Sequence, residues 1–270
     1  MSGEPIIVPP LKWAGGKRWL IQSRALPIPS FRRYIEPFFG SGAVFFALKP
    51  ERSIISDCNA DLIETYRAIR DRPDLVRRYL VAHQSAHSKE HYYQVRCSIS
   101  KSQFKRAARF LYLNRTCWNG LYRVNRSGQF NVPIGTKNNV VYESDDFYSV
   151  AQLLRRTELI VSDFQTTIDQ AGQGDFVFAD PPYTTAHNTN GFVKYNQNIF
   201  SWEDQVRLAD CLKAAILRGA RVALTNADHQ SVRDLYQGIM SRICLERSSV
   251  IASKANHRRR TTELLYLSHA

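Results

Sequence analysis

The chain has 270 residues, of which 44% are hydrophobic and 11% aromatic, the composition of a globular protein with one or two domains. Its 37 lysines and arginines outnumber 24 aspartates and glutamates, which leaves a formal net charge of +13. This excess indicates a polyanionic partner. Nucleic acid is favoured over an anionic membrane surface, because no long basic amphipathic helix stands out.

The cysteines and the N-terminus exclude several classes of protein. The 5 cysteines are scattered without a CxxC pair, which argues against a disulfide framework and a zinc site, so we predict no metal. Residues 1–10 lack the charged start and apolar core of a signal peptide, and no apolar stretch approaches membrane-spanning length. We expect a cytoplasmic protein that contacts no membrane and is a monomer in solution.

The first part of the chain predicts a strand–helix–strand unit. Arg33–Glu36 has the pattern of a short strand, and a glycine-containing loop follows it. Ala43–Leu48 is apolar throughout and predicts a buried helix, after which Ser53–Asp57 predicts a second strand. A strand, loop, helix and strand in this order indicate a βαβ unit and therefore a parallel sheet.

The middle part, residues 61–156, is rich in Arg, Tyr and His and mostly helical in its periodicity. One interruption stands out, where Leu121–Val124 and Gln129–Val132 flank the polar segment Asn125–Gly128. Alternating runs around Asn, Ser and Gly predict a β-hairpin.

The α/β pattern resumes afterwards. A capping box at Ser201 and Asp204 begins a helix that ends at Arg218-Gly219. The predicted strands of this part are 159–163, 176–180 and 221–225, with a terminal pair at 244–251 and 263–267. The fold class is therefore α/β, a doubly wound sheet with a basic, partly helical insertion.

The tetrapeptide Asp180-Pro181-Pro182-Tyr183 follows a fully apolar strand. Two prolines cannot continue a sheet ladder, so the strand ends at Asp180, and ligands of open α/β sheets bind at such carboxyl ends. The tetrapeptide thus presents a carboxylate, stiff backbone carbonyls and an aromatic ring at a candidate site. An ordinary turn after a strand is the alternative interpretation.

A glycine loop precedes the predicted helix at 43–48. Phe38-x-Gly40-x-Gly42 lets the backbone approach a ligand, and Asp57 ends the next strand 57 − 40 = 17 residues after Gly40. In nucleotide-binding βαβ units, an acidic side chain roughly 20 residues after the glycine loop reaches the ribose hydroxyls, and the offset of Asp57 is close to this. Phe45 stands where a dinucleotide fingerprint has its third glycine, so a nucleoside fits better than NAD.

A third motif lies near the N-terminus, at Lys12–Lys17. It contains Gly-Gly-Lys before an apolar helix, but Arg18 replaces the Ser or Thr that a P-loop requires, so ATP is not predicted. Lys17 at a helix start suits a carboxylate, and Trp13 suits stacking on the same ligand. A surface lysine and a core tryptophan are the alternative.

Together these motifs resemble the Dam-type DNA adenine-N6 methyltransferases, in which they occur in the same order. The motifs are Lys12–Lys17, Glu36–Gly42, Asp57, Asp180–Tyr183 and the segment from Asn114 to Gly135. The resemblance spans nearly the whole chain. It implies S-adenosylmethionine as cofactor, double-stranded DNA as partner, and methyl transfer to the N6 amine of a flipped adenine in a bacterial or phage setting, including restriction–modification systems.

The resemblance also implies a domain layout. It predicts a seven-stranded, mostly parallel sheet with the DNA-binding insertion between its second and third strands. Residues 1–60 and 157–270 would then form the cofactor-binding catalytic domain, and residues 61–156 the target-recognition domain.

By resemblance, the site residues fall into three sets. The catalytic set is Asp180, Pro181, Pro182 and Tyr183. The S-adenosylmethionine set is Trp13, Lys17, Phe38, Gly40, Gly42, Asp57, Asp163, Phe164 and Asp180. The DNA set is Trp118, Asn119, Leu121, Arg123, Arg126, Pro133 and Lys137.

Within the DNA set, Arg123 is expected to contact a guanine, while Arg126 and Lys137 contact phosphate. Arg258-Arg259-Arg260 is expected to be a phosphate-contacting loop. The expected target is GATC. Thr136-Lys137 replaces an Arg-aromatic pair of the family, a departure within the recognition segment.

Two other functions compete with this interpretation. The related Asn-Pro-Pro-Tyr motif serves protein-glutamine and RNA methyltransferases, whereas Asp180 and the arginine-rich hairpin favour DNA adenine. A non-catalytic DNA-binding protein with this fold would be expected to have lost Lys17, Asp57 or Asp180, and all three are present.

Overall fold

The structure is a computed structural model that describes residues 7–125, 127–186, 200–248 and 260–269. The chain forms two compact units. One, here called the helical unit, comprises Met1–Ser23, Phe39–Glu51 and Asp57–Val161. The other, the sheet unit, comprises Arg24–Phe38, Arg52–Ser56 and Ser162–Ala270. Arg126 and Arg258-Arg259, for which phosphate contacts are predicted, lie outside the described residues.

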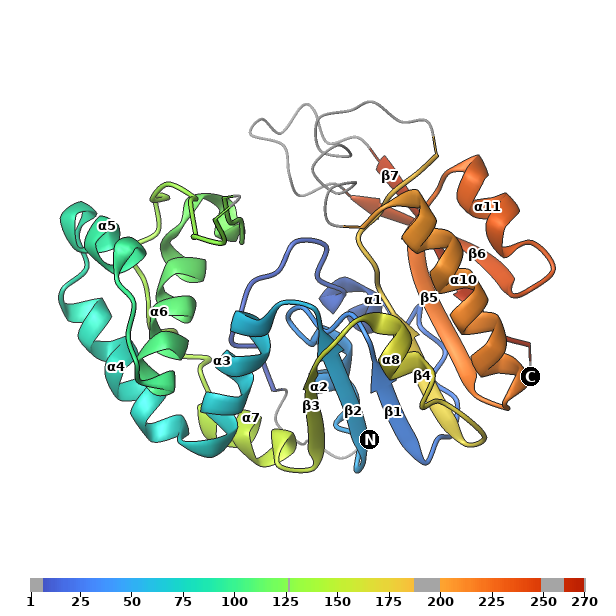
Figure 1. Cartoon of the computed structure of the whole chain (residues 1–270), viewed down its shortest axis with the longest axis horizontal. Helices are drawn as coiled ribbons and strands as arrows, with labels where there is room; N and C mark the ends of the chain where they lie inside the picture. The colour runs from blue at the N-terminus through green and yellow to red at the C-terminus, as the bar shows by residue number, and fades with distance from the viewer. Residues whose placement is uncertain (1–6, 126, 187–199, 249–259, 270) are drawn as a thin grey trace. The chain divides into compact units, whose positions relative to one another are not determined.

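Seven strands form one sheet in the order β3-β2-β1-β4-β5-β7-β6 (Figure 1). The strands are β1 Arg33–Glu36, β2 Ser53–Asp57, β3 Thr157–Val161, β4 Asp175–Ala179, β5 Arg221–Ala227, β6 Ser241–Ser248 and β7 Arg260–Leu267. The pairs β1–β2, β1–β4 and β4–β5 are parallel, whereas β5–β7 and β6–β7 are antiparallel. The predicted mostly parallel, Rossmann-like sheet is confirmed.

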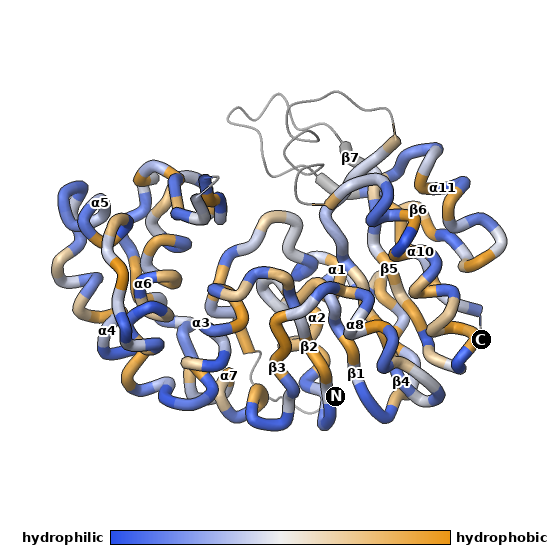
Figure 2. The backbone as a smooth tube through the Cα atoms, viewed as in Figure 1, coloured by the Kyte–Doolittle hydropathy of each residue, from blue (hydrophilic) through white to orange (hydrophobic). Residues whose placement is uncertain are grey.

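Strand β4 is buried along its whole length. Val177 pairs with Ile35 of β1 on one side and with Val222 of β5 on the other. A strand covered on both faces is expected to be a continuous apolar run, which is the pattern of residues 176–179. Figure 2 shows hydrophobic residues in β2 and β3 as well.

Helices α8 (Phe164–Ile168), α10 (Trp202–Leu217) and α11 (Gln230–Tyr236) lie on one face of the sheet (Figure 1). The predicted capping box of α10 is present. The backbone N–H of Asp204 donates to Ser201 Oγ at 3.1 Å, and the N–H of Ser201 donates to Asp204 Oδ2 at 2.9 Å. These two bonds satisfy orphan donors and start the helix where the sequence predicts.

The helical unit carries most of the residues between β2 and β3 in the chain. Its helices are α1 Arg18–Gln22, α2 Ala43–Leu48, α3 Ala60–Asp71, α4 Pro73–Ser85, α5 Lys89–Cys97, α6 Gln103–Thr116, the 3-10 turn Trp118–Gly120 and α7 Phe147–Leu154. Part of its core is aromatic: the rings of Phe39, Phe45, Phe46 and Tyr66 contact one another with centroids 4.8–6.2 Å apart. The predicted helix at 43–48 is present as α2, and it buries Phe45 and Phe46 in this cluster.

The predicted hairpin is present as a short bridge rather than two long strands. Val124 and Phe130 form an isolated antiparallel bridge. The N–H of Asn125 donates to the carbonyl of Gln129 at 2.8 Å, and the N–H of Asn131 donates to that of Arg123 at 3.1 Å. The Asn125 side chain closes the turn by accepting the N–H groups of Ser127 and Gln129 at 3.0 and 2.9 Å.

Several strand boundaries differ from prediction. Strands β4 and β5 end at Ala179 and Ala227, and β7 begins at Arg260. Strand β3 covers Thr157–Val161 rather than 159–163, because Asp163 begins α8 as its N-cap. Strand β6 begins earlier than predicted, at Ser241. In the described ranges, no helix combines the length and apolarity needed to cross a bilayer.

Arg115 of α6 is the largest fully buried polar side chain, and its charge is matched by Asp145. Its guanidinium donates to both carboxylate oxygens of Asp145, at 2.6 and 2.7 Å, and to the carbonyls of Pro10 and Val140, both at 2.7 Å. This network joins the N-terminal segment and the 140–145 loop to α6.

Asp145→Ala should therefore destabilise the protein by about 3–5 kcal/mol, because it leaves a buried guanidinium without its counter-ion. Chemical denaturation measures this change. Asp74→Ala is the matched control, since Asp74 forms an exposed ion pair with Arg72 and its removal should leave the midpoint unchanged. Equal midpoints for the two variants would contradict the structural role of the Arg115–Asp145 pair.

Candidate active site

The carboxylate of Asp180 lies at the carboxyl end of β4 and is held there by β5. Thr225 Oγ1 donates to Asp180 Oδ1 at 2.7 Å. Thr225 is fully buried, whereas Asp180 is half-buried. Because a β-branched side chain in a strand has restricted χ1 rotamers, the Thr225 hydroxyl holds this carboxylate oxygen in one position.

The remaining residues of the tetrapeptide are also anchored. Gln205 of α10 donates through Nε2 to the carbonyl of Pro182 at 3.3 Å and accepts the Asn226 amide at 3.0 Å. The phenol of Tyr183 donates to Glu263 Oε1 in β7. Gln205, Asn226 and Glu263 are all buried, so the tetrapeptide is a supported strand end and not a free turn.

An aromatic cluster of the sheet unit surrounds Phe38. Its ring stacks on Phe164 at a centroid distance of 5.4 Å and meets Phe200 edge-on at 5.6 Å. The Arg207 guanidinium covers Phe164, 4.1 Å from the ring centroid. Phe164 is thus buried between neighbours, which supplies a packing role beside the predicted contact with the cofactor adenine.

Asp163 has a structural role in the same cluster. It pairs with both terminal nitrogens of Arg207, at 2.6 and 2.9 Å, and accepts the N–H of Gln165 as the N-cap of α8. The hydrogen bonds from Arg207 lower the pKa of the Asp163 carboxyl. Its predicted part in cofactor binding stays a prediction.

In the helical unit, Asp57 joins the glycine loop to the start of α3. Its Oδ2 accepts the N–H of Gly40 at 3.0 Å and its Oδ1 accepts that of Asn59 at 2.9 Å. Burial raises the pKa of Asp57, against the two N–H groups, which lower it. The sequence therefore correctly associates Asp57 with the loop, and the contact is a direct hydrogen bond.

Gly40 and Gly42 have left-handed backbone, with φ of +48° and +66°. A Cβ on Gly40 would lie 2.7 Å from Trp13 Cδ1, and one on Gly42 would lie 2.5 Å from the Phe39 ring. Only glycine relieves both the backbone strain and the close approach at these positions. The loop consequently packs directly against Trp13.

Trp13 and Lys17 lie in the same unit as this loop. Trp13 is half-buried and stacks on Tyr122, with ring centroids 5.6 Å apart. Lys17 is buried, and its Nζ donates to the carbonyl of Gly15 at 2.9 Å. A glycine cradle, a carboxylate and a buried ammonium fit a nucleoside that carries a carboxylate and ribose hydroxyls.

The predicted DNA residues gather around the hairpin of the helical unit. Trp118 is 51% exposed and Leu121 37% exposed, and the backbone N–H of Trp118 donates to the carbonyl of Pro133 at 2.9 Å. Exposed apolar side chains such as these two suit contact with a partner. Asn119 is exposed with a φ of +56°, a conformation that Asn tolerates better than most residues.

Two cations of this region have close polar neighbours. Arg123 is exposed, and its Nε donates to Asn131 Oδ1 at 2.8 Å across the hairpin. Lys137 has its pKa lowered by the neighbouring Lys12. Asn114 in turn clamps Lys12, accepting its N–H at 2.9 Å and donating to its carbonyl at 2.8 Å. Lys12 was not among the predicted DNA residues.

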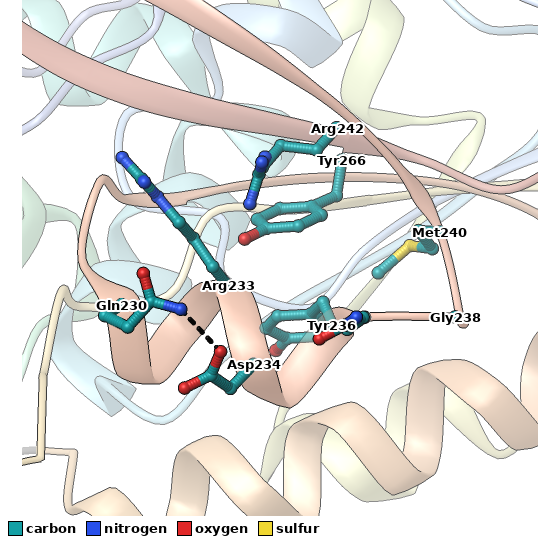
Figure 3. A pocket seen from close by; sticks show the side chains of 9 residues that line it. Gln230, Arg233, Asp234, Tyr236, Gly238, Met240, Arg242 and Tyr266 are labelled. Atoms are coloured by element: carbon teal, nitrogen blue, oxygen red, sulfur yellow. Dashed lines mark hydrogen bonds between the residues drawn. The ribbon is translucent and has the colours of Figure 1, made fainter.

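The cavity in Figure 3 lies elsewhere. It measures about 480 Å³, is lined by residues of α11, β6 and β7 including Arg233, Arg242 and Tyr266, and contains no predicted site residue. Within the described ranges, no group of three or more His, Cys, Asp or Glu side chains could hold a metal ion.

Comparison with known proteins decides the family. Residues 13–251 match the model of the D12 class N6 adenine-specific DNA methyltransferase. The chain belongs to this family. It is 37% identical to the type II methyltransferase M1.LlaDCHI of Lactococcus lactis subsp. cremoris, over 96% of this chain and 94% of that protein. It is 34% identical to the DNA adenine methylase of Escherichia coli strain K12, over 95% of this chain and 94% of that protein.

A third relative is larger. The DNA N-6-adenine-methyltransferase of Escherichia phage P1 is 38% identical over 83% of this chain and 30% of that protein. The resemblance stated from the motifs is confirmed. As a member of the D12 class, the protein is a DNA adenine-N6 methyltransferase that uses S-adenosylmethionine as methyl donor.

Because Thr225 fixes the carboxylate of the tetrapeptide, Thr225→Val should lower the single-turnover methylation rate about 10- to 100-fold with little loss of stability. The substitution keeps the shape of the side chain and removes only its hydroxyl. Thr65→Val is the matched control: Thr65 is equally buried but donates to the carbonyl of Asp61 within α3. An unchanged rate for Thr225→Val would show that Asp180 does not depend on this bond.

Proposed function

We propose that the protein is a site-specific methyltransferase that modifies the N6 amine of an adenine extruded from double-stranded DNA, within the sequence GATC. The observation that carries this proposal is the anchored tetrapeptide, in which Thr225 holds the carboxylate of Asp180 and Glu263 holds the Tyr183 ring. An amine inside a base pair is inaccessible, so a site of this kind requires an extruded base.

We propose cofactor roles for the glycine-loop residues. Lys17 would neutralise the cofactor carboxylate, Asp57 would accept from ribose hydroxyls, and Trp13 would contact the cofactor. Phe38, Gly40 and Gly42 would shape its pocket. Asp57 already accepts two backbone N–H groups and the Cys58 thiol, and a carboxylate has about four lone pairs, so it can still accept from a hydroxyl. Asp163 and Phe164 would contact the adenine of the cofactor. When bound, this cofactor supplies a methyl group on a sulfonium centre.

The tetrapeptide would activate the target amine by orienting it. The adenine amine is a weak nucleophile because its lone pair is delocalised into the purine ring. Asp180 and the backbone carbonyl of Pro181 can accept hydrogen bonds from its two N–H groups, and Pro181 and Pro182 stiffen that carbonyl. The lone pair is then directed out of the ring plane.

Positive charge that develops on nitrogen would be stabilised by the same groups. The carboxylate of Asp180, the carbonyl dipole and the face of the Tyr183 ring all present negative potential, and Tyr183 would stack on the extruded base. Asp180 has no need to remove a proton beforehand, because a neutral aromatic amine is a very weak acid. The proton leaves after alkylation, when the nitrogen is cationic.

Sequence recognition would come from the hairpin. Because Nε of Arg123 is bound to Asn131, its two terminal nitrogens point as a fixed fork that can donate to guanine O6 and N7. Trp118, Asn119, Leu121 and Pro133 would contact bases, while Arg126 and Lys137 would contact phosphate. The net charge of +13 favours DNA of any sequence and leaves discrimination to these few contacts.

Asp180→Ala should lower the methylation rate about 1,000-fold or more while DNA affinity is retained, because the carboxylate acts on the amine and not on the DNA backbone. Single-turnover transfer of a labelled methyl group and a gel-shift titration measure the two quantities. Asp169→Ala removes an exposed acid of the same unit and serves as control. Substantial turnover by Asp180→Ala would refute the proposed chemistry.

Arg123→Ala should reduce the preference for GATC over sites with a substituted guanine about 5- to 100-fold, since a bidentate contact contributes about 1–3 kcal/mol of discrimination. Methylation-sensitive sequencing of DNA treated with each variant gives the preference directly. Lys137→Ala should instead weaken binding to all sequences equally and flatten the salt dependence. If Arg123→Ala kept its discrimination, the hairpin would not be the reading element.

A further inference from the structure

Glu263 is a buried carboxylate next to the proposed reaction centre that no motif of the sequence predicted. It is 4% exposed and lies in β7, opposite Ala227 of β5 and Leu245 of β6. Its Oε1 accepts the phenolic hydrogen of Tyr183, which stands 80 positions earlier in the chain. Charged side chains are rarely buried to this degree without a specific partner.

The bond completes a pattern at the end of the sheet. Thr225 of β5 holds Asp180, the first residue of the tetrapeptide, and Glu263 of β7 holds Tyr183, the last. Strands β5 and β7 are hydrogen-bonded neighbours, with Thr225 opposite Leu265 and Ala227 opposite Glu263. The antiparallel β5–β7 pair therefore fixes both ends of Asp180–Tyr183 through side chains.

The negative charge of Glu263 changes the Tyr183 ring more than a neutral hydrogen-bond acceptor would. A phenol that donates to a carboxylate acquires partial phenolate character, which raises the electron density of its ring. The face of an electron-rich ring attracts a cation more strongly. Burial strengthens this effect, because the carboxylate is poorly screened by water.

We propose that Glu263 is a positioning residue for methyl transfer, one that orients the Tyr183 ring and increases the negative potential of its face toward the cationic nitrogen. The proposal rests on the proposed function, because it requires the target amine to meet that face. Glu263 itself touches neither the base nor the cofactor and acts through the Tyr183 hydroxyl.

The test is a double-mutant cycle on the full-length protein. Glu263→Gln keeps the size of the side chain and an acceptor oxygen but removes the charge, and Tyr183→Phe removes the hydroxyl through which Glu263 acts. Glu263→Gln should lower the single-turnover rate about 3- to 30-fold and leave the dissociation constants for S-adenosylmethionine and DNA unchanged. In the Tyr183→Phe background, the same change should have no further effect.

Glu246→Gln is the control, since it removes an exposed carboxylate of the neighbouring strand β6 and should leave the rate unchanged. A second readout is the quenching of 2-aminopurine placed at the target position, which reports stacking of the extruded base. Glu263→Gln should preserve this quenching, because the neutral acceptor still orients the ring, while Glu263→Ala should diminish it.

If Glu263→Gln lowered the single-turnover rate by the same factor with and without Tyr183→Phe, the proposal would be overturned. That result would show that Glu263 does not act through the Tyr183 hydroxyl. If Glu263→Gln fails to fold, Tyr183→3-fluorotyrosine tests the same step by withdrawing electrons from the ring, and an unchanged rate would overturn the proposal. Failure of the proposed function looks different: the unmodified protein itself would then methylate no adenine in DNA.

Discussion

The end of β4 is the constraint on which the rest of the site depends. Two prolines stop the strand where it is still paired with β5, at Ala179 and Leu224, so the carboxylate of Asp180 directly follows a rigid, buried element. The hydroxyl of Thr225 then removes most of its remaining rotational freedom. Orientation of the target amine needs this stiffness, because a carboxylate on a mobile turn would lose the alignment that raises the reactivity of a weak nucleophile.

The glycine loop is also held in place, by close packing and a hydrogen bond and not by strand pairing. Its left-handed glycines allow the backbone to approach Trp13, and Asp57 fastens the loop through the N–H of Gly40. The residues proposed to bind the cofactor thus also hold the loop in shape. Substitutions at Asp57 will consequently combine a loss of binding with a change in loop conformation, whereas substitutions at Asp180 affect an element that is already fixed by the sheet.

The fold could be predicted from the sequence where local signals agree with burial. Ala43–Leu48 and Ser53–Asp57 were predicted to the residue, because the local sequence pattern and the burial of these short segments agree. Thr225, Gln205 and Glu263 could not be predicted as site residues. Their contacts join positions 45, 23 and 80 apart, and they depend on the register of β5 and β7 and on the placement of α10. For Asp163 only the element was wrong: it was predicted to end a strand, whereas it caps α8 and pairs with Arg207. Its predicted contact with the cofactor stays a prediction.

The central claim is that the tetrapeptide places one methyl group on the exocyclic amine of adenine in DNA. Nucleoside mass spectrometry of unmethylated plasmid DNA, after incubation with the purified protein and S-adenosylmethionine, tests it most directly. The account predicts that N6-methyldeoxyadenosine accumulates while deoxycytidine stays unmodified. Methylated deoxycytidine in its place, or no methylated nucleoside at all, would contradict it.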